Sequence, residues 1–400
     1  MFDRFRAQAA SASGQDTPYW RLSTFYFFYF AVLGALVPFW ALYLQSLSYS
    51  AQQIGYVMAA LAISRIVAPN IWGYLADKTG QRLRIIRWGS CLAALCFLGV
   101  FWQSSYLAMF SVVIAYSFFW NAVLAQFEVV TLDHLTENTE QYSRIRLWGS
   151  VGFIVAVMLL GALFDAFSIA LLPVAMLVLL LAIWLSSLTV TEAKPRSLVS
   201  KSSDNVALER FLDIVRRREV WVFFTASFFL QISHGAYYTF FSVLLEQHAY
   251  SGFAIGLLWA LGVLAEIILF MYMPSLLRRF GARLLFWAAL LAAAGRWLLT
   301  PVLADSLLAL ILLQCLHALT FGAAHAVSIE WVHRFFPNSS HGQGQALYTA
   351  MCFGAGGAIG AILCGYLWDI SPFWCFAFCA AAAFIGFLLS YWGMRQAQLD

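Results

Sequence analysis

Charged residues are scarce in this chain. They make up 10% of its 400 residues, whereas apolar residues make up 62%. A soluble domain carries about 25% charged residues, so the composition excludes one. A bilayer-spanning helix needs about 20 mostly apolar residues. Twelve segments meet this description, at 20–47, 52–76, 85–102, 105–133, 146–165, 167–188, 220–246, 252–277, 284–303, 305–333, 345–368 and 372–394. The sequence predicts an all-α integral membrane protein with twelve transmembrane helices.

The motifs of several chemistries are also missing. The chain contains no HExxH, GxSxG or HxxxH pattern, which argues against an intramembrane hydrolase. All seven cysteines fall within predicted helices and none forms a CxxC pair, so we expect no metal site. The first residues lack the apolar core and cleavage site of a secretory signal, so we expect the first helix to be retained. We predict that the protein is not an enzyme and holds no cofactor.

Basic residues are absent from the predicted outer loops. If both termini are cytoplasmic, all of the 23 lysines and arginines except Arg65 and Arg296 fall at the cytoplasmic side. This asymmetry is what the positive-inside rule requires. The sequence therefore predicts cytoplasmic termini and a multi-pass protein of the cell inner membrane. The net charge of +4 follows from this topology and does not indicate nucleic-acid binding.

One long polar stretch, residues 189–218, divides the chain. Six predicted helices precede it and six follow. We expect an N-terminal six-helix bundle (1–188), a cytoplasmic linker (189–218) and a C-terminal six-helix bundle (219–400). Two halves of this kind are typical of transporters built from repeats.

The loop after the second predicted helix narrows the class. Its sequence, GYLADKTGQRLR at 73–84, resembles the cytoplasmic signature of the major facilitator superfamily. Gly73, Asp77, Gly80 and Arg82 stand in the signature positions. The resemblance implies a gating loop in which Asp77 contacts a neighbouring arginine, and this contact breaks and re-forms as the halves rock.

Further stretches resemble the phenylpropionate permease branch of that superfamily, which is similar to the oligosaccharide and nucleoside proton symporters. They include YSRIRLWGSVGFI (142–154), LWALGVLAEIILF (258–270) and LQCLHALTF (313–321). By resemblance to lactose permease, Glu128 and Arg146 match the acid and arginine that bind sugar. Arg296 and His317 match its ninth-helix arginine and tenth-helix histidine. The acid expected three residues after that histidine is Thr320 here.

Two segments of the second half repeat one pattern. QISHGAYYTFFS and QCLHALTFGAAH both place Gln and His three residues apart and an aromatic residue four further on. Each set falls on one helical face. This similarity is either a relic of a three-plus-three repeat or chance.

Ionisable residues gather in the middle of the seventh to tenth predicted helices. Glu266 is the only fixed counter-charge for Arg296 at that depth, so we expect it to neutralise Arg296 directly or through a histidine. Such residues inside a membrane are functional by default, although ion pairs also hold helices together. The predicted proton-coupling residues are Glu266, His317, Arg296, His325 and His234.

A second set of residues has the chemistry to bind a substrate that carries an aromatic ring and a carboxylate. Arginine matches a carboxylate in two-pronged geometry, and aromatic side chains match a ring. The predicted substrate-binding residues are Glu128, Arg146, Arg65, Tyr29, Trp40, Gln231, Tyr238 and Gln314. For each aromatic residue, packing or a place in the interfacial belt is an alternative role.

These features predict a proton-coupled symporter that imports a small organic solute by alternating access, with a phenylpropionate-like aromatic carboxylate as the implied substrate. A sugar or nucleoside symporter is an alternative, as is an efflux antiporter of the same fold. The antiporter is disfavoured because residues 147–164 lack its usual proline. The expected partners are the substrate, protons and membrane lipids, without nucleic acid, and the expected state is a monomer.

Overall fold

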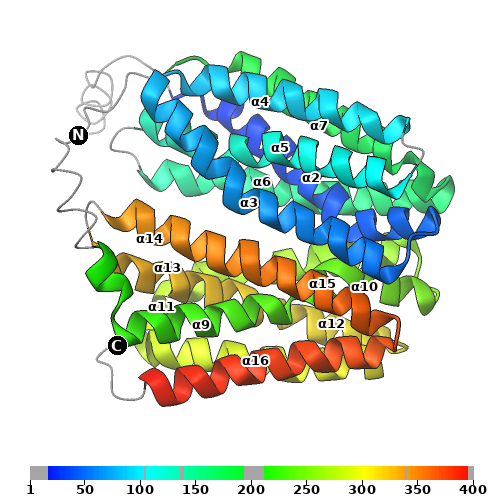
Figure 1. The fold of residues 1–400 in the computed structure, drawn as a ribbon, viewed down its shortest axis with the longest axis vertical. Coiled ribbons are helices and arrows are strands. Elements are labelled where there is room, and N and C mark those ends of the chain that lie inside the picture. Colours follow the sequence, from blue (N-terminus) through cyan, green and yellow to red (C-terminus); the bar gives the residue numbers. More distant parts are fainter. Residues whose placement is uncertain (1–16, 103–104, 136–138, 193–210, 338–339, 395–400) are drawn as a thin grey trace, which may run out of the picture.

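The computed structural model describes residues 17–102, 105–135, 139–192, 211–337 and 340–394. Within these ranges every regular element is a helix. The helices run roughly antiparallel and form two groups, one above the other in Figure 1. We call the end at which α2 begins and α16 finishes the terminal end, and the opposite end the far end.

The first group contains the helices that precede the polar stretch. Because each connection is short, consecutive helices run in opposite directions. The elements are α2 (Tyr19–Ser46), α3 (Ala51–Thr79), α4 (Arg82–Phe97) with the 3₁₀ turn Leu98–Phe101, α5 (Tyr106–Leu135), α6 (Thr139–Ala166), the 3₁₀ turn Ile169–Leu171 and α7 (Leu172–Thr189).

The second group contains the helices that follow it. Most of the predicted linker, residues 193–210, lies outside the described residues. The elements are α9 (Arg218–Ser233), α10 (Gly235–Gln247), α11 (Gly252–Val302), α12 (Leu307–Cys315), η3 (Ala318–Ala323), α13 (Ala324–Phe335), α14 (His341–Tyr348), η5 (Thr349–Gly356), α15 (Gly357–Trp368) and α16 (Pro372–Met394). The elements η3 and η5 are π-helical.

Ten helical segments of the described residues are long and apolar enough to cross a membrane. The segment predicted at 220–246 is interrupted at His234, so α9 and α10 are each too short to count alone. The segments predicted at 252–277 and 284–303 belong to one element, α11. Gly281, with φ 73° and ψ 157°, interrupts its helical backbone. The number twelve therefore stays a prediction.

Local sequence signals set the other helix ends. Ser50 and Gln53 form a reciprocal capping box at the start of α3. Ser251 caps α11 by accepting the Ala254 N–H. Gly80 ends α3 with φ 67°, a left-handed conformation that glycine adopts without strain.

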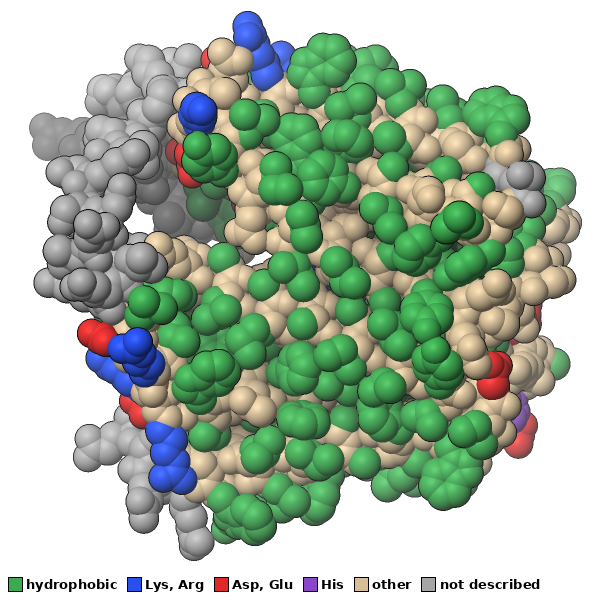
Figure 2. All heavy atoms as spheres, viewed as in Figure 1, with side chains coloured by type: hydrophobic (Ala, Val, Ile, Leu, Met, Phe, Trp, Pro, Cys, Tyr) green, Lys and Arg blue, Asp and Glu red, His purple; other side chains and the backbone are tan. Residues whose placement is uncertain are grey.

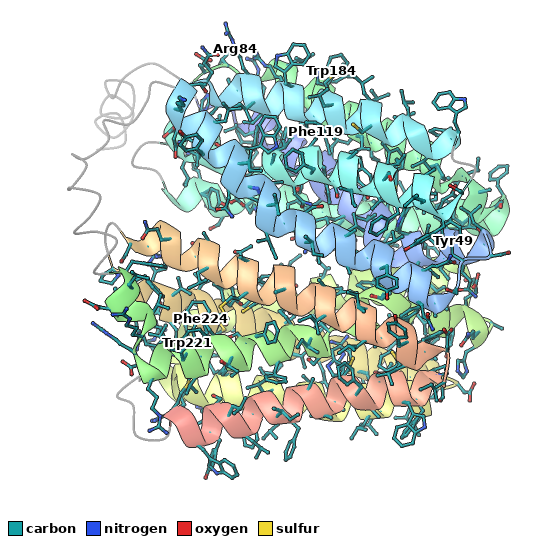
Figure 3. All side chains as sticks on the ribbon, viewed as in Figure 1. Tyr49, Arg84, Phe119, Trp184, Trp221 and Phe224 are labelled. Carbon is teal, nitrogen blue, oxygen red and sulfur yellow. The ribbon has the colours of Figure 1, made fainter. Side chains whose placement is uncertain are left out.

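The surface is banded as in a membrane protein. Large apolar side chains are exposed along the middle of the helices, among them Val178, Leu291 and Phe384 at 44–59%. In Figure 2 they cover the middle of the visible face, whereas lysine and arginine gather toward the terminal end. Figure 3 shows Arg84 toward that end on the first group and Tyr49 at the far end. This distribution is that of a multi-pass membrane protein.

The two groups pack against each other at the far end. A β-carbon on Gly55 of α3 would lie 2.6 Å from the carbonyl oxygen of Ala361 on α15. Gly256 of α11 packs against the Val157 carbonyl of α6 in the same way. Glycine therefore permits backbone contact between the groups here. Toward the terminal end the groups diverge, and Figure 2 shows the surface hollowed between them.

Candidate functional site

The two repeated motifs coincide with irregular helix geometry. His234 separates α9 from α10, and the π-helical η3 follows His317 directly. The motifs lie together in space, because the His234 and Phe321 ring centroids are 6.1 Å apart and those of Tyr238 and Phe321 are 6.4 Å apart. Broken helices and π-bulges are common at the binding sites of transporters.

Arg296 lies at the centre of this region and is only 2% exposed. Its guanidinium donates to Gln314 Oε1 at 2.5 Å, Thr320 Oγ1 at 3.0 Å and His317 Nδ1 at 3.2 Å. It also stacks over the Tyr237 ring, 4.6 Å from the centroid. Neutral acceptors and an aromatic face thus stabilise a permanent charge that lipid would not tolerate.

Glu266 reaches Arg296 through His317. Its Oε2 atom lies 3.9 Å from His317 Nε2, while Nδ1 of the same ring accepts from Arg296. Among the described residues, no carboxylate forms an ion pair with Arg296 directly. The expected contact is therefore made through the histidine. The Glu266 side chain is 18% exposed, so water can reach it.

Gly322 makes room for that carboxylate. A β-carbon at this position of η3 would come within 3.0 Å of Glu266 Cγ and 3.1 Å of Leu269 Cδ2. The π-helical turn therefore presents an open backbone surface to Glu266.

The first group contributes a second charged pair. Arg146 Nε lies 3.8 Å from Glu128 Oε1, and its guanidinium sits 4.0 Å from the Phe30 ring centroid. The two charged side chains are 32% and 37% exposed. Arg146 lies on α6 and Glu266 on α11, and these helices of the two groups pack against each other where Gly256 meets the Val157 carbonyl. The two charged clusters therefore face each other between the groups.

Arg65 lies on α3 beside the same space. It lies near Tyr29 and Tyr116 of its own group and near Tyr238 of the other. Within the described part of the chain it forms no hydrogen bond or ion pair. Tyr29 stacks on Trp120 with ring centroids 5.0 Å apart, and both are nearly buried.

The remaining predicted residues divide between this region and the packing of the bundles. Gln231 and His325 line a small pocket together with Thr320 and Phe321. The side-chain Oε1 atom of Gln314 accepts hydrogen bonds from Arg296 and Tyr237. Gln314 therefore belongs to the buried hydrogen-bond network around Arg296. Trp40 is fully buried and packs on Tyr43 and on Phe97 of α4, so it lies within the first bundle, apart from the charged clusters. Its substrate role stays a prediction.

The predicted gating loop, residues 73–84, occupies the terminal end of α3 and α4. Arg82 forms an ion pair with Asp77 and donates to Gln126 Oε1 of α5 at 2.6 Å. Gly80 provides the turn, and Gly73 packs near the Gln126 amide. All of these contacts stay within the first group.

A family model described as the MFS_1 like family matches residues 19–378. The chain belongs to this family. It is 28% identical to the "Probable 3-phenylpropionic acid transporter" of Escherichia coli (strain K12), over 90% of this chain and 94% of that protein. It is also 28% identical to the maltose permease of Geobacillus stearothermophilus, over 88% and 89%. Its family and relatives are transporters, not enzymes.

Solved structures share the fold of this MFS chain. The nucleoside transporter NupG matches with a TM-score of 0.80 at 18% identity, covering 96% of this chain and 99% of that one. A bacterial homologue of the human lysosomal transporter Spinster, in an inward-facing and unoccupied conformation, matches with a TM-score of 0.73 at 14% identity, covering 95% and 98%.

Tyr26 and three further residues of this candidate site were missed from the sequence. Phe30 lies one helical turn after Tyr26, and both rings contact Arg146. Trp297 follows Arg296 directly and lies 4.5 Å from its guanidinium. The third is Gly322. A signal existed only for Phe30, because its spacing from Tyr26 places both rings on one helical face.

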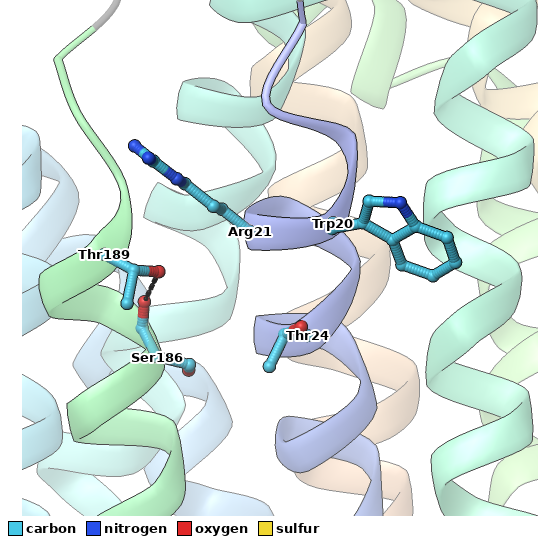
Figure 4. A pocket seen from close by; sticks show the side chains of 5 residues that line it. All are labelled: Trp20, Arg21, Thr24, Ser186 and Thr189. Carbon is cyan, nitrogen blue, oxygen red and sulfur yellow. Dashed lines mark hydrogen bonds between the residues drawn. The ribbon is translucent and has the colours of Figure 1, made fainter.

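A further pocket of this MFS chain lies outside the region between the groups. It has a volume of about 430 Å³ and lies between α2 and α7 near the terminal end. Figure 4 shows its lining residues, Trp20, Arg21, Thr24, Ser186 and Thr189. Because α2 and α7 belong to the same group, this pocket is not part of the path between the groups.

Proposed function

We propose that this protein imports a small aromatic carboxylate together with protons across the cell inner membrane. The observation that carries the proposal is the charge balance between the two groups of helices. Three arginines (Arg65, Arg146 and Arg296) face two glutamates (Glu128 and Glu266), and Arg65 has no ionic partner among the described residues. An anionic substrate would supply the missing negative charge.

Aromatic side chains around Arg65 suit the rest of such a substrate. Tyr29 and Trp120 stack on the first-group side, and Tyr238 lies close to Trp259 on the other. A ring between them would gain stacking contacts. The relative named as a phenylpropionic acid transporter supports the same class. The Glu128–Arg146 pair and the maltose permease relative favour a sugar as the second candidate.

The coupling proton is assigned to Glu266 and His317. Because His317 Nδ1 accepts a hydrogen bond from Arg296, the neutral ring carries its proton on Nε2, which faces Glu266. A carboxyl group that is partly exposed and faces an imidazole can take up a proton and release it again. Thr320 holds the guanidinium where an acid was expected, so Glu266 is left as the proton carrier.

The membrane orientation belongs to the same proposal. The α3–α4 connection and the start of α9 lie at the terminal end and carry basic residues, so we assign that end to the cytoplasm. We treat α9–α10 as one span and α11 as two, which gives twelve spans. In this orientation the space between the groups opens to the cytoplasm.

The test is uptake into vesicles of a phenylpropionate-like acid, maltose and a nucleoside, with and without an uncoupler. We expect the acid to accumulate and the uncoupler to abolish its accumulation. Arg65→Gln should lower acid uptake about tenfold or more, because it removes a charged hydrogen bond to the substrate. Arg21→Gln, in the surface pocket, is the matched control and should transport normally. Preference for maltose or the nucleoside would contradict the substrate class, and extrusion of the acid would contradict import.

A further inference from the structure

A carboxylate of the first group caps a helix of the second group at the far end. Asp165, one residue before the end of α6, accepts the Gly252 N–H at 2.5 Å through Oδ1. It accepts the Phe253 N–H at 2.8 Å through Oδ2. These are the first two residues of α11, so both carboxylate oxygens hold one helix N-terminus of the opposite group.

This helix end is capped from both sides. The first N–H groups of a helix have no partner within it and carry partial positive charge, so they bind a carboxylate well. The side chain of Ser251, the cap of α11 itself, satisfies only the Ala254 N–H. The Gly252 and Phe253 N–H groups, which precede Ala254, donate instead to Asp165 from across the interface.

Glycines at this contact allow the backbones of α6 and α11 to approach each other closely. A β-carbon on Gly252 would lie 2.8 Å from the Gly161 carbonyl oxygen and 3.0 Å from Asp165 Oδ1. The reverse contact, from Gly161 to the Gly252 carbonyl, is tighter still. Glycine on both helices therefore lets the carboxylate reach the helix end.

We propose that Asp165 is a latch that holds the far end of the transporter closed and sets the balance between its two conformations. Separation of α6 from α11 must break both hydrogen bonds. Asp165 is exposed, so water replaces its partners when the latch opens, and the net stabilisation stays modest. A modest contact suits a latch that is released in every transport cycle.

Two other far-end contacts show what is particular about Asp165. The hydroxyl groups of Tyr56 and Tyr366 lie 2.5 Å apart across the other interface, between α3 and α15, and carry no charge. Asp305 pairs with His248 at 2.6 Å, but both residues belong to the second group. Among the described residues, Asp165 forms the charged hydrogen bonds that join the two groups at this end.

The test measures the distance between the groups directly. Spin labels are placed on Leu107→Cys of the first group and Ile370→Cys of the second, both 69% exposed near the far end. Cys91, Cys96 and Cys315, the native cysteines that are not buried, are replaced by serine. Pulsed electron resonance on the purified transporter then gives the populations with the far end closed and open.

We expect Asp165→Asn and Asp165→Ala each to raise the ratio of open to closed protein about tenfold, because a charged hydrogen bond is lost. Asp305→Asn removes the same charge at the same end and should leave the ratio unchanged. An unchanged ratio in either folded Asp165 variant would overturn the proposal, and so would an equal shift in Asp305→Asn. Because no substrate or proton gradient is used, the outcome is independent of the proposed substrate and coupling ion.

Discussion

Arg296 illustrates how single residues decide the chemistry of this site. A charge in the middle of an apolar segment requires neighbours that the segment itself does not reveal. Those neighbours are neutral oxygens from Gln314 and Thr320, the His317 ring and the face of Tyr237. Arg296 therefore does not need Glu266 for its own stabilisation. This agrees with the proposal that Glu266 carries the coupling proton.

Replacement of Glu266 tests this separation of roles. Glu266→Gln should abolish uphill accumulation of substrate and preserve equilibrium exchange, because the neutral side chain resembles the protonated carboxyl and cannot release a proton. The measurement compares gradient-driven uptake with counterflow in vesicles. Glu128→Gln should impair both modes, since Glu128 is assigned to substrate binding. Accumulation by Glu266→Gln that still responds to an uncoupler would contradict the assignment, and His234 or His325 would be the next proton carrier to test.

At the scale of the elements, interruptions of regular α-helix geometry coincide with the candidate site. The interruption at His234 and the π-helical turns η3 and η5 alter the direction of side chains near the middle of the second group. One consequence is that Gly322 faces Glu266 across the contact between η3 and α11. A regular helix would present different residues there.

Gly322→Ala tests the importance of this turn. Its β-carbon would lie 3.0 Å from Glu266 Cγ, so the Glu266 side chain must shift by a few tenths of an ångström. We expect proton-driven accumulation to fall about tenfold, as a 1 Å misplacement of a functional group can cost still more. Gly342→Ala in α14 is the control, because a β-carbon there meets nothing within 4 Å. Normal accumulation by Gly322→Ala would show that the contact does not position Glu266.

At the scale of the whole molecule, alternating access requires the two groups of helices to separate at one end as they close at the other. In this structure the far end is closed by glycine contacts and by Asp165. The gating loop at the terminal end makes its contacts within the first group only. The two ends therefore differ in which residues hold them.

Asp77→Asn tests the gating loop. Loss of the ion pair with Arg82 should slow transport several-fold while substrate affinity stays nearly unchanged, because the loop is remote from the charged clusters. Initial uptake rates and equilibrium binding together separate the two effects. Asp213→Asn removes a surface ion pair with Arg216 at the same end and should transport normally. A large loss of affinity with a normal turnover rate would contradict a gating role for Asp77.

The sequence by itself determined the membrane class and the helical segments, since apolar length and helix propensity are local properties. Most predicted spans agree with described helices to within a few residues, and the loop signature at 73–84 indicated the superfamily. The glycine and aspartate spacing of that loop is also a local feature.

Only the tertiary structure decided which side chains contact one another. Trp40 and Tyr29 lie on the same helix, yet Trp40 packs against α4 and Tyr29 lies near Arg65. Asp165 and Gly252 are far apart in sequence and meet only because α6 packs on α11. The bond from Arg296 to His317 likewise depends on how α11 packs against η3 and α12. Such contacts form across helices, and hydrophobic periodicity fixes which residues form a helix but not which partner each face receives.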